Sequence, residues 1–160
     1  MLFRSFLVLR AQQIGLSVTW IPLVMVVMAL FYTLSAYPAG WLSDRISRTK
    51  LLCVGIGLLV LADLVLAQSS SVITMLLGVA LWGLHMGFSQ GILASLVADK
   101  APGKLKGTAF GIFNLVSGVC MLIASILAGW LWQSIGSDST FLMGALLAAI
   151  ALLLLLIKKQ

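Results

Sequence analysis

Charged side chains are scarce in this sequence, and glutamate is absent altogether. Aspartate, lysine and arginine together make up 9% of the 160 residues, whereas apolar residues make up 62% even without glycine. Soluble domains are about 25% charged, and they are about 45 to 50% apolar with glycine counted. Because too little polar surface is available to cover a globule in water, an ordinary soluble fold is excluded. The composition indicates an integral membrane protein in contact with the lipid bilayer.

Cysteine and histidine are also rare, which limits the chemistry that the chain can carry. Cys53 and Cys120 fall within or beside apolar runs, where thiols usually pack as small hydrophobes. We therefore expect neither a disulfide nor a metal site. The sequence has no glycine-rich phosphate cradle and no nucleophile paired with a base at a useful spacing. These absences predict that the chain is not an enzyme and needs no cofactor.

The sequence does contain long stretches without charged residues. They cover residues 11–43, 64–98, 107–137 and 139–157. A helix needs about 20 mostly apolar residues to cross a hydrocarbon layer about 30 Å thick. A transmembrane barrel would alternate polar and apolar residues, and the stretch ALLAAIALLLLLI near the C-terminus does not alternate. We predict an all-α fold, a polytopic bundle of transmembrane helices.

Polar turn residues divide the chain into five predicted spans within a single transmembrane domain, residues 1–160. The spans are residues 21–42, 51–67, 72–97, 108–132 and 140–157. Residues 1–10 are too short to cross a bilayer and contain Arg4, so we interpret them as the remnant of a preceding helix.

Basic residues outnumber acidic ones by ten to four, but they stand in short clusters at the ends of apolar runs. No basic face of a soluble module results, so nucleic acid is not an expected partner. The clusters fall in alternate loops and in the tail: Arg45, Arg48, Lys50, Lys100, Lys104, Lys106, Lys158 and Lys159. Short loops rich in lysine and arginine stay in the cytoplasm. We predict a multi-pass protein of the plasma membrane or cell inner membrane with a cytoplasmic C-terminus.

The densest charge cluster stands in GWLSDRISRTK, which begins at Gly40. This stretch resembles the G-x-L-[SA]-D-R-x-G-R-[RK] loop of the major facilitator superfamily, with Asp44, Arg45 and Arg48 at the expected spacing. A serine replaces the second glycine of that pattern. A later stretch, VADKAPGKLKGTAFGIFN, looks like another cytoplasmic loop of the same family, with lysine where arginine is commoner. The resemblance covers nearly the whole chain.

The resemblance implies the C-terminal half of a major-facilitator-type fold, with helices eight to twelve and a remnant of the seventh. It implies a secondary active transporter that moves a small solute by alternating access and is coupled to an ion gradient, a proton being the candidate ion. An N-terminal six-helix half would be its partner. The tryptophan and methionine content of residues 72–97 favours export of hydrophobic compounds. The alternative is a truncated or half-length membrane protein with no transport of its own.

By the same resemblance, Gly40, Asp44, Arg45 and Arg48 form a cytoplasmic latch between the two halves. A carboxylate near a helix N-terminus is stabilised by about 0.3 to 1 kcal/mol when exposed, which suits a reversible contact. The alternative is that these charges only fix the topology. The positive-inside rule accounts for the arginines but not for Asp44.

Glycines recur every four residues in two places, where small side chains let helix backbones approach closely. They are Gly83, Gly87 and Gly91 in one span and Gly107 and Gly111 in the next. We predict that they pack against neighbouring helices. The alternative is that the first three let their helix flex during transport.

Polar and aromatic residues are densest in the predicted span 72–97. Four of them are spaced by three and four and so share a helix face. Polar groups at membrane depth usually face a protein interior or a water-filled path. We predict a substrate cavity lined by Trp82, His85, Met86, Ser89, Gln90, Asn114 and Tyr32. The alternative is that Ser89 and His85 only bond to neighbouring helices.

Two titratable residues lie within predicted spans. His85 could carry a proton because imidazole titrates near neutral pH, although a lone histidine more often packs or hydrogen-bonds. Asp63 is costly in lipid, so we expect it near a partner helix or neutral. The resemblance places the helix of Asp63 at the periphery, which argues against a substrate role.

Overall fold

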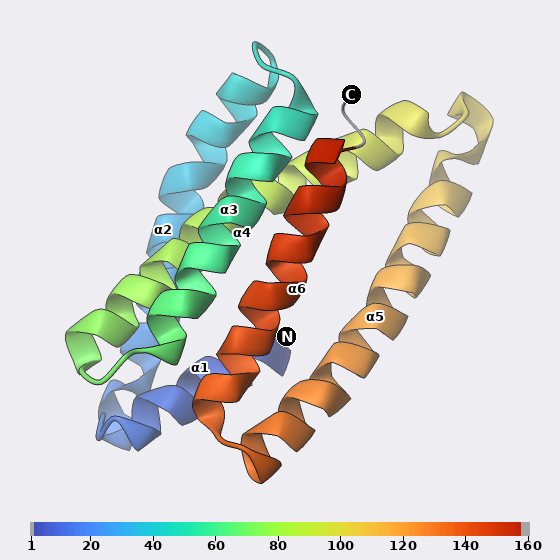
Figure 1. Cartoon of the computed structure of the whole chain (residues 1–160). Helices are drawn as coiled ribbons and strands as arrows, with labels where there is room; N and C mark the ends of the chain where they lie inside the picture. Colours follow the sequence, from blue (N-terminus) through green and yellow to red (C-terminus); the bar gives the residue numbers. More distant parts are fainter. Residues whose placement is uncertain (1, 158–160) are drawn as a thin grey trace.

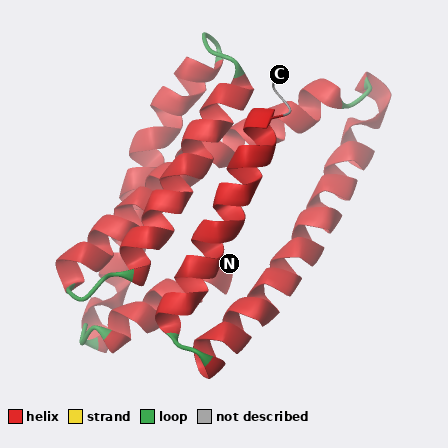
Figure 2. Ribbon diagram, in the orientation of Figure 1, coloured by secondary structure: helices red, strands yellow, loops and turns green. Residues whose placement is uncertain are grey.

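The computed structural model describes residues 2–157, and these form helices joined by short loops, with no strand among them. The elements are α1 (Leu2–Gln13), the short 3-10 turn η1 (Val18–Trp20), α2 (Ile21–Ser43), α3 (Arg48–Ala67), α4 (Val72–Lys100), the turn η2 (Gly103–Leu105), α5 (Lys106–Ser134) and α6 (Ser137–Ile157). Figure 2 shows this all-helical architecture. The predicted all-α, polytopic bundle is confirmed.

Helices α2 to α6 are long and apolar enough to cross a membrane. They begin and end within a few residues of the expected spans, but α4 and α5 are longer, with 29 residues each. At about 1.5 Å per residue, each covers about 44 Å, which exceeds the hydrocarbon thickness of about 30 Å. The expected spans stopped at the flanking charges. A helix that enters the headgroup region tolerates charges, so α4 continues to Lys100.

The first helix is also longer than the ten residues expected, since α1 continues to Gln13; Met1 lies outside the described residues. Its end is set by Gly15, whose φ of 92° is a left-handed conformation that favours glycine. The amide of Leu16 then donates to the carbonyl of Ala11 at 3.0 Å. This closing turn directs the chain from α1 into α2.

Helix α4 lies between α2 and α3 and packs extensively against both, while α6 packs against α3. Figure 1 shows α5, in orange, standing apart from the other long helices. Helix α5 contacts α4 and α6 only sparsely, and its buried residues are Ala128 and Leu131. The larger of the two clusters of buried apolar residues includes Leu7 of α1, Val24 of α2 and Phe141 of α6, all fully buried.

The charged loops gather at one end of the bundle. The α2/α3 loop, the α4/α5 connection and the last turns of α6 all lie at the top of Figure 1. Lys158 and Lys159 lie outside the described residues. The structure thus brings the basic loops to a single end. The cytoplasmic location of this end stays a prediction.

At the opposite end, Arg10 joins segments that are far apart in the sequence. Its Nε donates to Oγ of Ser69 at 3.1 Å, and its NH2 group donates to the carbonyls of Ala67 and Ser69 at 3.2 and 2.9 Å. Its NH1 group donates to Oγ of Ser137 and forms an ion pair with Asp138, both at 2.7 Å. Arg10 is only 8% exposed. The arginine therefore ties the end of α1 to the α3/α4 turn and to the start of α6.

Candidate functional site

Helices α2 and α4 approach each other closely at two glycines. A Cβ added to Gly83 would lie 2.5 Å from the carbonyl oxygen of Met28, and one added to Gly87 would collide with the side chain of Ser35. Ser35 is buried, and its hydroxyl donates to the carbonyl of Phe31 at 2.7 Å. No larger residue fits at either glycine without moving the α2 backbone or this bonded serine.

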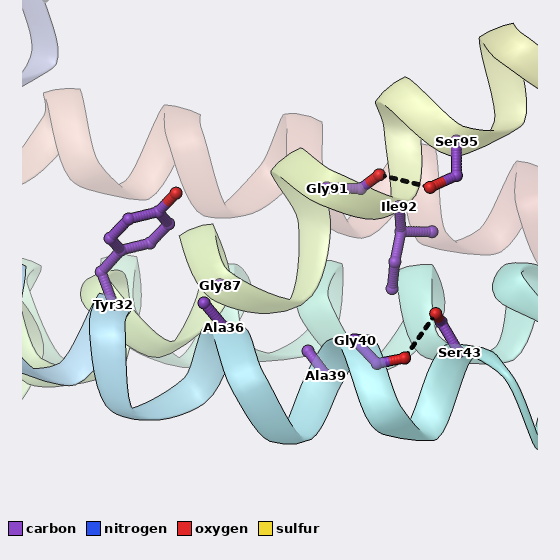
Figure 3. A pocket seen from close by; sticks show the side chains of 9 residues that line it. All are labelled: Tyr32, Ala36, Ala39, Gly40, Ser43, Gly87, Gly91, Ile92 and Ser95. Atoms are coloured by element: carbon purple, nitrogen blue, oxygen red, sulfur yellow. Dashed lines mark hydrogen bonds between the residues drawn. The ribbon is translucent and has the colours of Figure 1, made fainter.

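Toward the charged end, α2 and α4 diverge and leave a groove of about 190 Å³, shown in Figure 3. Small residues line most of it, among them Gly40 on α2 and Gly91 on α4. A Cβ added to either glycine would meet no atom within 4 Å. Tyr32 supplies an aromatic wall at the other end of the groove. The α2/α4 groove is therefore open space beside a tight helix contact.

The α2/α3 loop lies next to this groove, and its arginines make contacts with neighbouring side chains. Arg48 begins α3 and forms an ion pair with Asp99 near the end of α4; its NH1 group also reaches the carbonyl of Ser95 at 3.5 Å. The guanidinium of Arg45 lies 3.9 Å from the ring centroid of Trp41, a cation–π distance. The two charged stretches of the sequence thus meet in space through Arg48 and Asp99.

Asp44 is different, because it is exposed at the C-terminal end of α2. Within the described part of the chain, its carboxylate has no hydrogen-bond or ion-pair partner. The pairing of Arg48 to α4 holds the start of α3 in place while the carboxylate of Asp44 is presented outward.

A second pocket, of about 370 Å³, lies on the other side of α4, between α3, α4, α5 and α6. Its polar lining residues are Asp63, Trp82 and His85. Trp82 Nε1 donates to Oδ1 of Asp63 at 3.1 Å, and His85 Nδ1 lies 2.8 Å from the carbonyl oxygen of Gly55. Because a carbonyl oxygen can only accept, the Nδ1 of His85 carries the proton. We call this space the Asp63 pocket.

The predicted cavity residues are distributed over several surfaces. Tyr32 lines the α2/α4 groove, whereas Trp82 and His85 line the Asp63 pocket. Ser89 is buried, and its hydroxyl donates to the carbonyl of His85 in its own helix. Met86 packs against the apolar cluster near α1. The shared face of α4 therefore meets more than one neighbour.

Gln90 on α4 and Asn114 on α5 are exposed. Taken with the residues above, the structure does not bring the seven candidates together as one lining within residues 2–157. Their role in a substrate cavity stays a prediction.

Three of the predicted packing glycines have no close neighbour. A Cβ added to Gly91, Gly107 or Gly111 would meet nothing within 4 Å in the described part of the chain. The described part of the chain therefore shows no close helix–helix packing at these three glycines. Among the described residues, no group of three or more histidine, cysteine or acidic side chains could hold a metal ion, and the two cysteines are free.

Comparison with known families settles the class of the molecule. Residues 1–160 match the sequence model of the Major Facilitator Superfamily. This chain belongs to the major facilitator superfamily. It is a multi-pass membrane protein, and the family and the relatives named below are transporters rather than enzymes.

Curated relatives of this superfamily chain cover much of its length. The "uncharacterized MFS-type transporter" MJ1317 of Methanocaldococcus jannaschii is 34% identical over 94% of this chain and 39% of its own length. The inner membrane transport protein YajR of Escherichia coli is 30% identical over 66% of this chain and 23% of its own length. The myo-inositol transporter 2 of Schizosaccharomyces pombe is 30% identical over 46% and 13%, respectively. The chain thus spans well under half the length of the relatives that it matches.

For this major facilitator superfamily chain, the sequence did not predict a substrate role for Asp63, because the resemblance places its helix at the periphery. The structure gives Asp63 a tryptophan donor and a pocket. Asp63 also lies only four residues before the end of α3, about 6 Å along the helix axis. A signal was present in the sequence, since a lone acid in an apolar span usually has a partner on a neighbouring helix. Helical spacing alone does not identify that partner.

Proposed function

We propose that this chain forms part of a secondary active transporter that moves a small solute across the plasma or inner membrane by alternating access. The family and the transporter names of its relatives support this proposal. The charged end of the bundle would face the cytoplasm, since its loops are short and rich in lysine and arginine. Ion-gradient coupling, with a proton as the ion, is part of the proposal.

The observation that carries the proposal is that one charged residue of the α2/α3 loop is paired within the bundle while another is exposed. Arg48 is paired with Asp99, whereas Asp44 is exposed at the end of α2. An exposed carboxylate gains about 0.3 to 1 kcal/mol at a helix N-terminus, and up to about 2 kcal/mol when partly buried. A contact of this size can hold one access state and still be released, because the states of such an equilibrium differ by only a few kcal/mol. Asp44 would then be the acid of a latch that closes on a facing helix of an N-terminal half.

The solute would bind on the open side of α2 and α4. Transporters of this kind hold their solute near the bilayer midplane, between repeats. Tyr32 in the α2/α4 groove and the exposed Gln90 on α4 offer aromatic and hydrogen-bonding contacts for a small molecule. Asn114, exposed on α5, is a separate candidate contact. Export of a hydrophobic solute remains part of the proposal on the tryptophan and methionine content of α4. Trp82 and Met86 themselves lie outside the α2/α4 groove.

Flux through reconstituted membranes tests the proposal. The purified chain, alone and co-expressed with an N-terminal six-helix half, would be placed in vesicles with an imposed proton gradient. Uptake of neutral hydrophobic dyes and of hexoses would be followed with and without a protonophore. Protonophore-sensitive flux of any of them by the chain alone would establish autonomous transport. Flux only with the second half would favour the alternative of a half-length protein, and its absence in both would refute the transport proposal.

The latch has its own test in the complete transporter. Asp44→Asn should slow turnover without changing the amount inserted in the membrane, because it removes the charge that meets the facing helix. Thr49→Ala, in the same loop but without a charge change, is the matched control. Unchanged turnover in Asp44→Asn would reduce the loop to a topology signal.

A further inference from the structure

We propose that the Asp63 pocket binds an organic ammonium ion that enters from the lipid, with the carboxylate of Asp63 as its counter-ion. This site goes beyond the proposed function. It lies on the α3 side of α4, whereas the α2/α4 groove lies on the opposite side. Binding here can be measured without any transport.

The first argument is the unbalanced charge. Asp63 is 2% exposed, and its hydrogen bond comes from the neutral indole of Trp82. The residues that line the pocket include no lysine or arginine, and neither ion pair among the described residues involves Asp63. A carboxylate buried at membrane depth is costly unless a cation or a proton compensates its charge. The pocket therefore favours a positively charged occupant.

The second argument is the hydrogen-bonding character of the polar wall. The Nδ1 of His85 is bonded to the carbonyl of Gly55, so in the neutral ring the remaining nitrogen, Nε2, is an acceptor. The carboxylate of Asp63 is also an acceptor. An ammonium group carries only donors, and it is also attracted to an aromatic ring such as that of Trp82. Acceptors and an aromatic ring in one pocket match that ligand class.

The third argument is the size and lining of the pocket that Asp63 borders. The volume of about 370 Å³ falls within the range of about 300 to 1,000 Å³ typical of small-molecule sites. Gly144 of α6 packs directly against the carboxylate, since an added Cβ there would be 2.6 Å from Oδ2; the room for a ligand is the rest of the pocket. Leu59, Leu147 and Ala148 make the remaining wall apolar. The site thus suits a cationic head at Asp63 and a hydrocarbon tail along α6.

Access from the lipid follows from the position of α5. Ala124 of α5 closes one side of the pocket, yet α5 makes few contacts with α4 and α6. Asp63 lies about one turn from the end of α3, so an amphiphile could place its head at Asp63 while its tail stays among apolar groups. The ligand class is a lipophilic primary or secondary amine in its protonated form.

The test uses the full chain in lipid nanodiscs and a fluorescent primary amine, monodansylcadaverine, with its uncharged N-acetyl derivative as the paired probe. Binding would be measured by fluorescence anisotropy. Asp63→Asn should weaken binding of the amine by about 30-fold, equivalent to about 2 kcal/mol, because it removes one partner of a buried charge pair. It should leave the acetylated probe unchanged. Asp138→Asn makes the same charge change outside the pocket and should bind the amine as the native chain does.

A second variant keeps the proposal testable if Asp63→Asn does not fold. Ala124→Phe fills the pocket from the half-buried face of α5 without a charge change, and it should weaken binding of both probes. Equal affinity of the native chain for the amine and its acetyl derivative would overturn the proposal, since the occupant would then be a neutral tail only. Undiminished amine binding in Asp63→Asn or in Ala124→Phe would overturn it as well.

Discussion

Replacing Arg10 by methionine should strongly destabilise the bundle, whereas removing the charge of Asp138 should not. Arg10 is buried and donates to the carbonyls of Ala67 and Ser69 as well as to side chains. Methionine fills a similar volume but leaves these acceptors without a donor. Breaking a buried charged network of this kind costs about 3 to 5 kcal/mol. The side chain of Asp138 is 63% exposed, so its ion pair with Arg10 is worth about 0 to 1 kcal/mol.

Thermal unfolding of the purified chain in detergent measures the difference. For domains of 150 to 250 residues, 1 kcal/mol shifts the melting temperature by about 2 to 4 °C. A loss of about 3 kcal/mol in Arg10→Met therefore predicts a decrease of about 6 to 12 °C, against less than about 4 °C for Asp138→Asn. Arg10→Lys should fall between them, because an ammonium keeps the charge but lacks the planar fork of donors. Equal melting temperatures for Arg10→Met and the native chain would refute this account of how α1 is held.

Other substitutions test the helix contacts, the charged loop and the topology. Gly87→Ala should lower the melting temperature, because the added Cβ would collide with Ser35 and overpacking costs about 1 to 3 kcal/mol. In Gly91→Ala the added Cβ meets no atom, so the melting temperature should stay the same or rise, since alanine is the better helix former by up to about 1 kcal/mol. Arg48→Gln should change the melting temperature by less than about 4 °C, because the ion pair with Asp99 is partly exposed and worth about 0 to 1 kcal/mol; a larger loss would mean that the loop is structurally essential. A fluorescent protein fused to the C-terminus should fold and fluoresce in the cytoplasm, and a tag accessible only from outside the cell would contradict the proposed orientation.

Much of the fold could be predicted from the sequence because lipid imposes simple requirements on length and hydropathy. Five spans followed from the apolar runs, and five helices with the required length and hydropathy are present. The ends were less well predicted. The helix containing Asp99 and Lys100 continues through these charges, since the headgroup region solvates them.

The candidate site was predicted less completely, because helical spacing places residues on a face without identifying the helix opposite. Gly55 and His85 lie at nearly equal distances in sequence from the α3/α4 turn, so an antiparallel pair would bring them together, as observed. Trp82 lies further from that turn than Asp63, and only its long side chain closes the distance. The network of Arg10 depends on loops remote in sequence and left no local signal.

Helix α4 presents Gly83 and Gly87 to α2, and Trp82 and His85 to α3. A helix moves largely as a rigid rod, so a movement of α4 that changed the space beside Tyr32 would also displace Trp82 relative to the carboxylate of Asp63. A molecule bound on one side of α4 would therefore change the affinity of the other side for its own ligand. Thermodynamic linkage requires this change in binding free energy to be the same in both directions.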